Sequence, residues 1–94
     1  MIKIVRSRKY EVGLKNLLTK YEDIDSVSLA IRLFSKNPDD TRLRTHPLRR
    51  RLKGRFAFNV DDDIRIIFEW LGKHRVRFLA IGKHKDVYPK SRSR

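Results

Sequence analysis

The sequence predicts an α+β domain in which a two-helix hairpin packs on one face of a mostly antiparallel sheet of four or five strands. Two periodicities support this prediction. Apolar residues recur at helical spacing between residues 10 and 34, and at every second position between residues 56 and 81. A helical hairpin buries its apolar side against another element, and the alternating strands provide the matching apolar face.

The N-terminal part should contain one strand and both helices. Residues 2–6 alternate as a short strand, and Ser7 can cap a helix that reaches a polar break at 22–23. A second helix is expected to begin at Ile24 and to end before Asn37-Pro38, because the residue before a proline disfavours helical backbone.

Three strands are expected over residues 56–60, 64–70 and 76–81, with turns at 61–63 and 71–74. A fifth strand is expected near Leu48–Leu52, if there is one. The alternation assigns one apolar set to the face under the helices: Phe56, Phe58, Val60, Ile64, Ile66, Phe68, Trp70, Val76, Phe78 and Ala80. The opposite face should be open and polar, with Arg55, Asn59, Arg65 and Arg77.

Composition narrows the class of protein. A chain of 94 residues is expected to form one domain over 1–94, with a short basic tail at 90–94. There is no cysteine, which excludes disulfides and Cys-ligated zinc and favours the cytoplasm. Residues 1–6 are too short and too charged for a signal peptide, and no apolar run is long enough to span a membrane.

The charge balance points to a polyanionic partner. Lys and Arg total 24 against 11 acidic residues, which gives a formal net charge of +13. Such an excess attracts nucleic acid first and an acidic protein second. A membrane surface ranks third, because no helix has the basic amphipathic pattern with bulky aromatic residues that membrane binding favours.

A dense basic stretch runs from Arg42 to Arg55, with no acidic residue inside it. Charged residues of this kind can simply form a solvated rim that protects a sheet edge. The density exceeds that need, so we interpret the stretch as a phosphate-binding track. The predicted RNA-binding residues are Arg49, Arg50, Arg51, Lys53 and Arg55, together with Lys83 and Lys85.

Two of the three histidines are candidates for acid–base chemistry. His46 and His84 lie before and after the strand region, and each has Arg or Lys close by, which favours a neutral imidazole near pH 7. Both could therefore meet at one sheet edge. The alternative is that they are surface residues, which is how we interpret His74 in the second turn.

The remaining candidates surround the third strand. Asp61–Asp63 could bind Mg²⁺, but consecutive residues of a turn point in different directions, so a hydrogen-bonded turn is the preferred interpretation. Asp63 leads into the strand that carries Arg65, which could clamp a phosphate or simply pair with Glu69. Tyr88 follows the last strand and could stack on a base or pack over an edge.

These motifs, taken in order, resemble the RelE/ParE superfamily of toxins from toxin–antitoxin pairs, and are most similar to its YafQ-like and YoeB-like members. The runs that carry the resemblance are His46-Pro47-Leu48, Leu52-Lys53-Gly54-Arg55-Phe56, Asp63-Ile64-Arg65-Ile66-Ile67-Phe68 and Gly82-Lys83-His84-Lys85-Asp86-Val87-Tyr88. The resemblance implies a ribosome-dependent endoribonuclease that cleaves messenger RNA and is held inactive by an acidic antitoxin.

The resemblance also implies roles for five residues. His46 matches a general acid or base, Asp63 an acidic active-site residue, Arg65 the arginine on the phosphate, His84 a C-terminal histidine, and Tyr88 an aromatic residue near the C-terminus. The chain departs from the pattern at Asn59, where YafQ-like toxins carry a further histidine. We expect no metal and no cofactor.

Two other functions stay open at this stage. The ParE branch inhibits DNA gyrase on the same fold without the nuclease residues, so its toxicity would not need a catalytic imidazole. An RNA- or ribosome-binding module would bind without cleaving. The pair His46 and His84 favours the ribonuclease.

Overall fold

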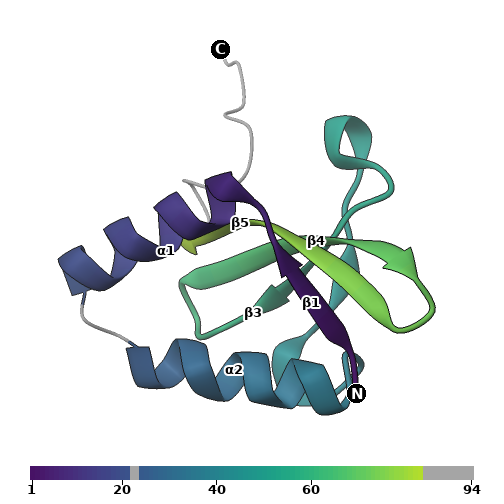
Figure 1. Ribbon diagram of the computed structural model, residues 1–94, viewed down its shortest axis with the longest axis horizontal. Coiled ribbons are helices and arrows are strands. Elements are labelled where there is room, and N and C mark those ends of the chain that lie inside the picture. Colours follow the sequence, from purple (N-terminus) through teal and green to yellow (C-terminus); the bar gives the residue numbers. More distant parts are fainter. Residues whose placement is uncertain (22–23, 84–94) are drawn as a thin grey trace.

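The computed structural model describes residues 1–21 and 24–83 (Figure 1). The expected break at 22–23 and the basic tail at 90–94 lie outside the described residues. The predicted site residues His84, Lys85 and Tyr88 lie outside them as well.

Within the described residues, two helices and five strands form the expected α+β architecture. The elements are β1 (Lys3–Arg6), α1 (Arg8–Tyr21), α2 (Ile24–Lys36), the 3-10 turn η1 (Thr41–Leu43), β2 (His46–Pro47), the 3-10 turn η2 (Arg50–Leu52), β3 (Phe56–Asn59), β4 (Ile64–Gly72) and β5 (Arg75–Lys83). The sheet has the order β1-β5-β4-β3-β2. The pair β1–β5 is parallel, and the other three pairs are antiparallel.

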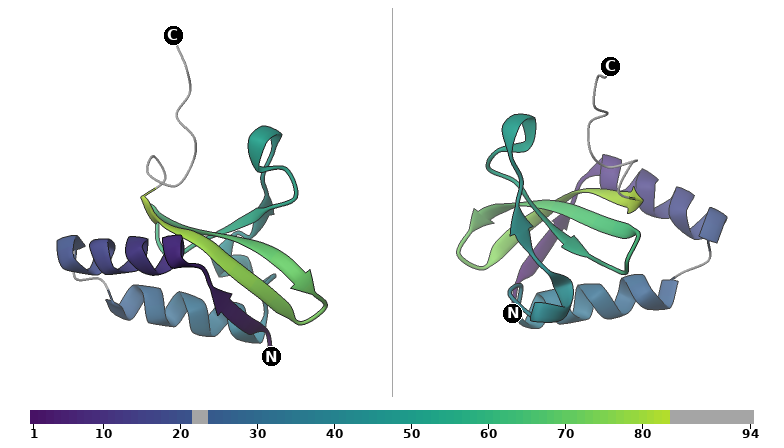
Figure 2. Two further views of the ribbon diagram at one scale, coloured as in Figure 1. Left: turned by 45° about the horizontal axis from the view of Figure 1, so that its top comes forward. Right: turned by 180° about the vertical axis from the view of Figure 1, so that it is seen from behind.

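Both helices lie on one side of the sheet, and the connection between β2 and β3 projects on the other side (Figure 2). Ser7 caps α1, as predicted, and it also ties the start of the helix to β5. The Ser7 hydroxyl accepts a hydrogen bond from the Tyr10 N–H at 3.0 Å and donates one to the Leu79 carbonyl at 3.1 Å. Further along α1, a Cβ atom at Gly13 would come within 2.8 Å of the Ile81 carbonyl oxygen, so glycine permits this close approach.

The core lies between the helices and the sheet, and aromatic rings dominate it. Phe34 of α2 stacks on Phe58 with ring centroids 4.5 Å apart, and meets Phe68 and Phe78 edge-on at 4.8 and 5.6 Å. All four rings are buried. The predicted core faces of β3 and β4 are confirmed as far as Phe68.

In β5 the predicted alternation is wrong at Ala80. Ile67 pairs with Ala80 and Phe68 pairs with Phe78, so β5 has one extra residue at this point. A bulge of this kind reverses the facing of every later side chain. Ile81 therefore enters the main core, and Ala80 belongs to a separate cluster on the opposite face.

Two other expectations are wrong. The fifth strand lies at His46–Pro47 and not at Leu48–Leu52, because Arg50 and Gly54 adopt positive φ angles of 58° and 91° and turn the chain over. Trp70 is 39% exposed, since the β4–β5 hairpin extends beyond both helices (Figure 1). None of the described helices is long and apolar enough to cross a membrane.

Candidate active site on the open face of the sheet

The open face, defined as the side of the sheet away from the helices, carries His46 at its β2 edge. His46 pairs with Ala57 of β3, Ala57 with Ile67 of β4, and Ile67 with Ala80 of β5. Side chains of residues paired across a sheet point to the same face. His46 therefore lies at the end of a row whose other members are small or apolar.

The His46 ring is exposed and has one hydrogen bond. Its Nδ1 atom lies 2.8 Å from the carbonyl oxygen of Arg44. The opposite ring nitrogen, Nε2, has no partner among residues 1–21 and 24–83 and is open to a ligand. His46 was expected to precede the strand region, and it lies instead within the sheet, in β2.

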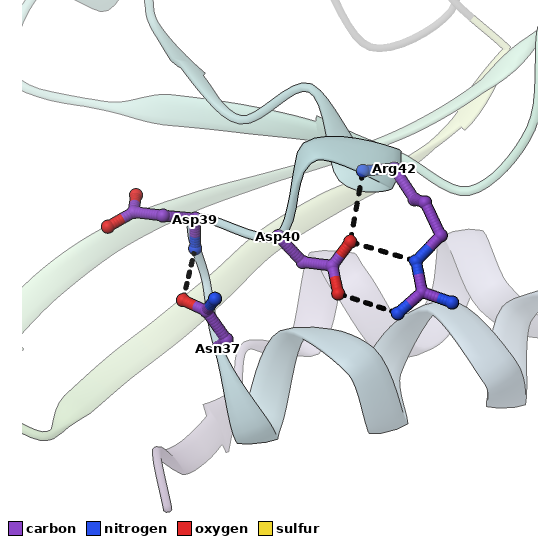
Figure 3. A network of polar contacts seen from close by, with 4 residues as sticks. All are labelled: Asn37, Asp39, Asp40 and Arg42. Carbon is purple, nitrogen blue, oxygen red and sulfur yellow. Dashed lines mark hydrogen bonds and ion pairs between the residues drawn. The ribbon is translucent and has the colours of Figure 1, made fainter.

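The loop before β2 is held by a compact polar network (Figure 3). The Asp40 carboxylate accepts hydrogen bonds from the Arg42 backbone N–H at 3.0 Å and from Arg42 Nε and Nη2 at 2.9 and 2.8 Å. These bonds, the side-chain ones first, lower the pKa of Asp40 to about 2, and the same contact raises the pKa of Arg42. The Arg42 guanidinium is therefore already paired with a carboxylate, and we exclude it from the predicted phosphate-binding track.

Arg65 occupies the next row of the open face, between Asn59 of β3 and Gly82 of β5. Its Nη1 atom donates hydrogen bonds to the carbonyl oxygens of Asp61 and Asp62, at 3.2 and 2.9 Å. The alternative of an Arg65–Glu69 pair is wrong, because Glu69 pairs with Arg77 at 3.1 Å. Among residues 1–21 and 24–83, Nε and Nη2 of Arg65 have no acceptor, so both are left for a ligand.

The β3–β4 turn is a hydrogen-bonded structure, as expected. The Asp61 carboxylate accepts from the N–H groups of Asp63 and Ile64, both at 2.8 Å. The Asp63 side chain is exposed, has no hydrogen bond within the described ranges, and lies two residues before Arg65. Among residues 1–21 and 24–83, no group of three His, Cys, Asp or Glu side chains is placed to hold a metal ion.

The projecting β2–β3 connection carries most of the predicted RNA-binding residues. It closes on itself through the Leu48 N–H and the Arg55 carbonyl, at 2.8 Å. Its cations are all exposed, and none forms an ion pair within the described part of the chain: Arg49, Arg50, Arg51, Lys53 and Arg55. Lys83 stands apart from this group, because it pairs with Ile64 on the side of the sheet that the helices cover.

The open face also carries a pocket, which the alternation of polar and apolar residues did not predict. The pocket is open, has a volume of about 260 Å³, and is lined by Ser7, Lys9, Leu52, Arg55, Ile67, Leu79 and Ala80. Its floor belongs to a small apolar cluster in which Leu48, Leu52 and Leu79 pack on Ala57, Ile67 and Ala80. The open face is therefore not purely polar. The sequence contains one signal of this apolar patch, because Ile67 is apolar although Arg65 and Glu69, its neighbours on the same face, are charged.

Comparison with solved structures identifies the fold. YafQ from Escherichia coli strain BL21(DE3) superposes with a TM-score of 0.80 at 21% identity, over 95% of this chain and 100% of that one. A copper-bound mutant toxin from Helicobacter pylori gives 0.78 at 18% identity, over 94% of this chain and all of that one. The YoeB/ParE toxin from Agrobacterium tumefaciens gives 0.72 at 14% identity, over 88% of this chain and 99% of that one.

The H. pylori and A. tumefaciens proteins are toxins, and this chain shares the fold of all three structures. YafQ in its complex with DinJ, from E. coli, is also similar, with a TM-score of 0.78 at 21% identity over 95% of this chain. No protein-family model matches the sequence, and a search of curated proteins finds no significant match.

Proposed function

We propose that this protein is the toxin of a toxin–antitoxin pair and that it cleaves messenger RNA on the ribosome without a metal ion. One observation carries the proposal. His46 and Arg65 lie on the same open face, on strands separated only by β3, beside five cations without ion pairs in the described chain. The similarity to toxins of known fold supports it.

The proposed reaction uses the RNA's own 2′-hydroxyl. A histidine takes the proton from O2′, and O2′ forms a bond to the adjacent phosphorus. The bond from phosphorus to O5′ breaks, and O5′ receives a proton from a second group. His46, His84 and Asp63 are the candidates for these two roles. The products are a 2′,3′-cyclic phosphate and a 5′-hydroxyl end.

Arg65 would bind the phosphate as negative charge accumulates on it. Its Nη1 is held by two carbonyls of the β3–β4 turn, so the guanidinium is oriented before substrate arrives. The free Nε and Nη2 groups form the two-pronged edge that matches two phosphate oxygens. The cations of the β2–β3 connection would hold the neighbouring phosphates, and Tyr88 would stack on a base.

Cleavage of a translated message by purified protein tests the proposal. We expect cleavage on ribosomes with cyclic phosphate ends and full rate in EDTA. His46→Ala should lower the rate by roughly a hundredfold, whereas the matched change His74→Ala, in the exposed β4–β5 turn, should not. Loss of cleavage in EDTA would indicate a metal enzyme. Growth arrest without cleavage, which also survives His46→Ala and His84→Ala, would indicate a gyrase inhibitor.

An acidic antitoxin is the proposed protein partner. The net charge of +13 and the basic rim of the pocket, formed by Lys9 and Arg55, would attract carboxylates to the open face. A segment lying there would cover His46 and Arg65. Co-expression with the adjacent gene should yield a co-purifying complex and relieve the growth arrest. The toxin–antitoxin assignment fails if no neighbouring product does either.

A further inference from the structure

We propose that the segment from Asn37 to Thr45 holds His46 as the Nδ1–H tautomer and thereby makes Nε2 of His46 the proton acceptor of the reaction. The inference rests on the proposed ribonuclease function and deepens it. It assigns the general base, which the sequence leaves open among His46, His84 and Asp63.

The first step of the inference is the hydrogen bond between His46 and Arg44. A backbone carbonyl can only accept, so the Nδ1 atom 2.8 Å from the Arg44 oxygen must carry the hydrogen. In a neutral imidazole the second nitrogen then bears a lone pair. Nε2 of His46 is therefore a proton acceptor, and it has no partner among the described residues.

The Arg44 carbonyl is in place because the backbone of Arg44 is left-handed. Arg44 has φ 50° and ψ 45°, and its N–H donates to the Thr41 carbonyl at 3.3 Å to close η1. This conformation is unfavourable for any residue with a Cβ atom, so neighbouring contacts must maintain it. The left-handed backbone at Arg44 turns the chain after η1 and places the Arg44 carbonyl beside the His46 ring, two residues later.

Three contacts maintain that conformation. Leu43 is only 1% exposed and fixes η1 in the core. Asp40 caps η1 and pairs with Arg42 (Figure 3). The Thr45 hydroxyl donates to the Pro38 carbonyl at 2.6 Å and closes the loop directly before His46. The segment is thus a rigid support for one ring nitrogen.

This arrangement suits a base better than an acid. When Nε2 takes the proton from O2′, the ring becomes a cation whose Nδ1–H still donates to the Arg44 carbonyl, and that dipole stabilises the new charge. The electron pair of O2′ forms the bond to phosphorus, and the P–O5′ pair leaves on O5′. The proton for O5′ then comes from His84 or Asp63.

The test measures the tautomer of the neutral imidazole in the free full-length protein by ¹⁵N NMR. His46→Gln assigns the signal. Arg44→Gly keeps both the carbonyl and the left-handed backbone. Arg44→Pro keeps the carbonyl but removes the left-handed backbone, because proline fixes φ near −65°, and so turns the carbonyl away from the ring. Thr45→Val removes only the loop-closing hydroxyl. Thr19→Val is its matched control, since the Thr19 hydroxyl bonds the Lys15 carbonyl on the exposed side of α1.

We expect one tautomer, Nδ1–H, in the wild type, in Arg44→Gly and in Thr19→Val. Arg44→Pro and Thr45→Val should show both tautomers and should lower kcat by roughly tenfold to a hundredfold with little change in KM. Nε2–H as the main wild-type form, or an unchanged kcat in a variant with mixed tautomers, overturns the inference. If the wild type shows the Nδ1–H form but cleaves no RNA, the proposed function fails and the base role with it.

Discussion

The guanidinium of Arg65 offers the sharpest test of the site, through the change Arg65→Lys. Arginine has five N–H donors. Two of them, on Nη1, are used by the carbonyls of Asp61 and Asp62, so three remain for phosphate oxygens. A lysine has three donors in all. If it keeps both turn carbonyls, it can offer one hydrogen bond to the phosphate. Arginine can direct two of its three remaining donors, one on Nε and one on Nη2, at two phosphate oxygens.

The magnitude follows from that count. Removing one donor that is aimed at developing transition-state charge costs about 10²–10³ in kcat, or about 2.7–4 kcal/mol. The net charge of the variant is unchanged, so ground-state RNA binding should change far less. We therefore expect the loss in kcat and little change in KM.

Single-turnover cleavage of a ribosome-bound message, together with RNA binding by anisotropy, measures the two quantities. Arg77→Lys is the matched control, because Arg77 lies on the same face but pairs with Glu69. It should cleave at close to the wild-type rate. Full activity of Arg65→Lys would refute the two-pronged contact, and equal losses in the two variants would refute the role assigned to Arg65.

Three further outcomes are expected. Tyr10→Phe should stabilise the fold by about 1 kcal/mol, because the buried Tyr10 hydroxyl has no hydrogen-bond partner in the described structure and burial raises its pKa. A thermal melt should show a higher Tm for the variant. A lower Tm would mean that the hydroxyl does form a stabilising hydrogen bond. Asp40, with its pKa lowered from 3.8 to about 2, stabilises the fold fully above about pH 4 and loses that contribution as the pH falls through 2. Melts from pH 4 to pH 2 should therefore fall more steeply for the wild type than for Asp40→Ala, and parallel curves would exclude the effect. Binding of single-stranded RNA should weaken with salt by about 0.7 logarithmic units per decade for each phosphate contacted, and Arg51→Ala should reduce that slope; a flat salt dependence would exclude the phosphate track.

Much of the fold was predictable because its signals are local. The N-cap at Ser7, the two helical stripes and the alternation in β3 and β4 each depend on residues within one element. The short turn at Asp61–Asp63 was also correctly placed, since its hydrogen bonds form within four residues.

The bulge in β5 was not predictable from alternation. Ala80 and Ile81 are both apolar, so the pattern Val76, Phe78, Ala80 fits the core as well as Val76, Phe78, Ile81 does. Only pairing with β4 selects the second register, and Gly13 lets α1 approach the Ile81 backbone closely. Trp70 likewise has an apolar position in the pattern, and its exposure depends on where the helices end.

The sequence by itself determined the fold class, the basic character of the protein and the chemical types that the site can use, because composition and periodicity are properties of the chain. Tertiary structure alone decided which of those groups lie on the same face of the sheet, and which hydrogen bonds and ion pairs each of them forms. The pairing of Glu69 with Arg77 leaves Arg65 to the turn carbonyls, and the left-handed Arg44 directs its carbonyl at His46. Such contacts depend on strand register and on single backbone angles, which a one-dimensional pattern does not contain.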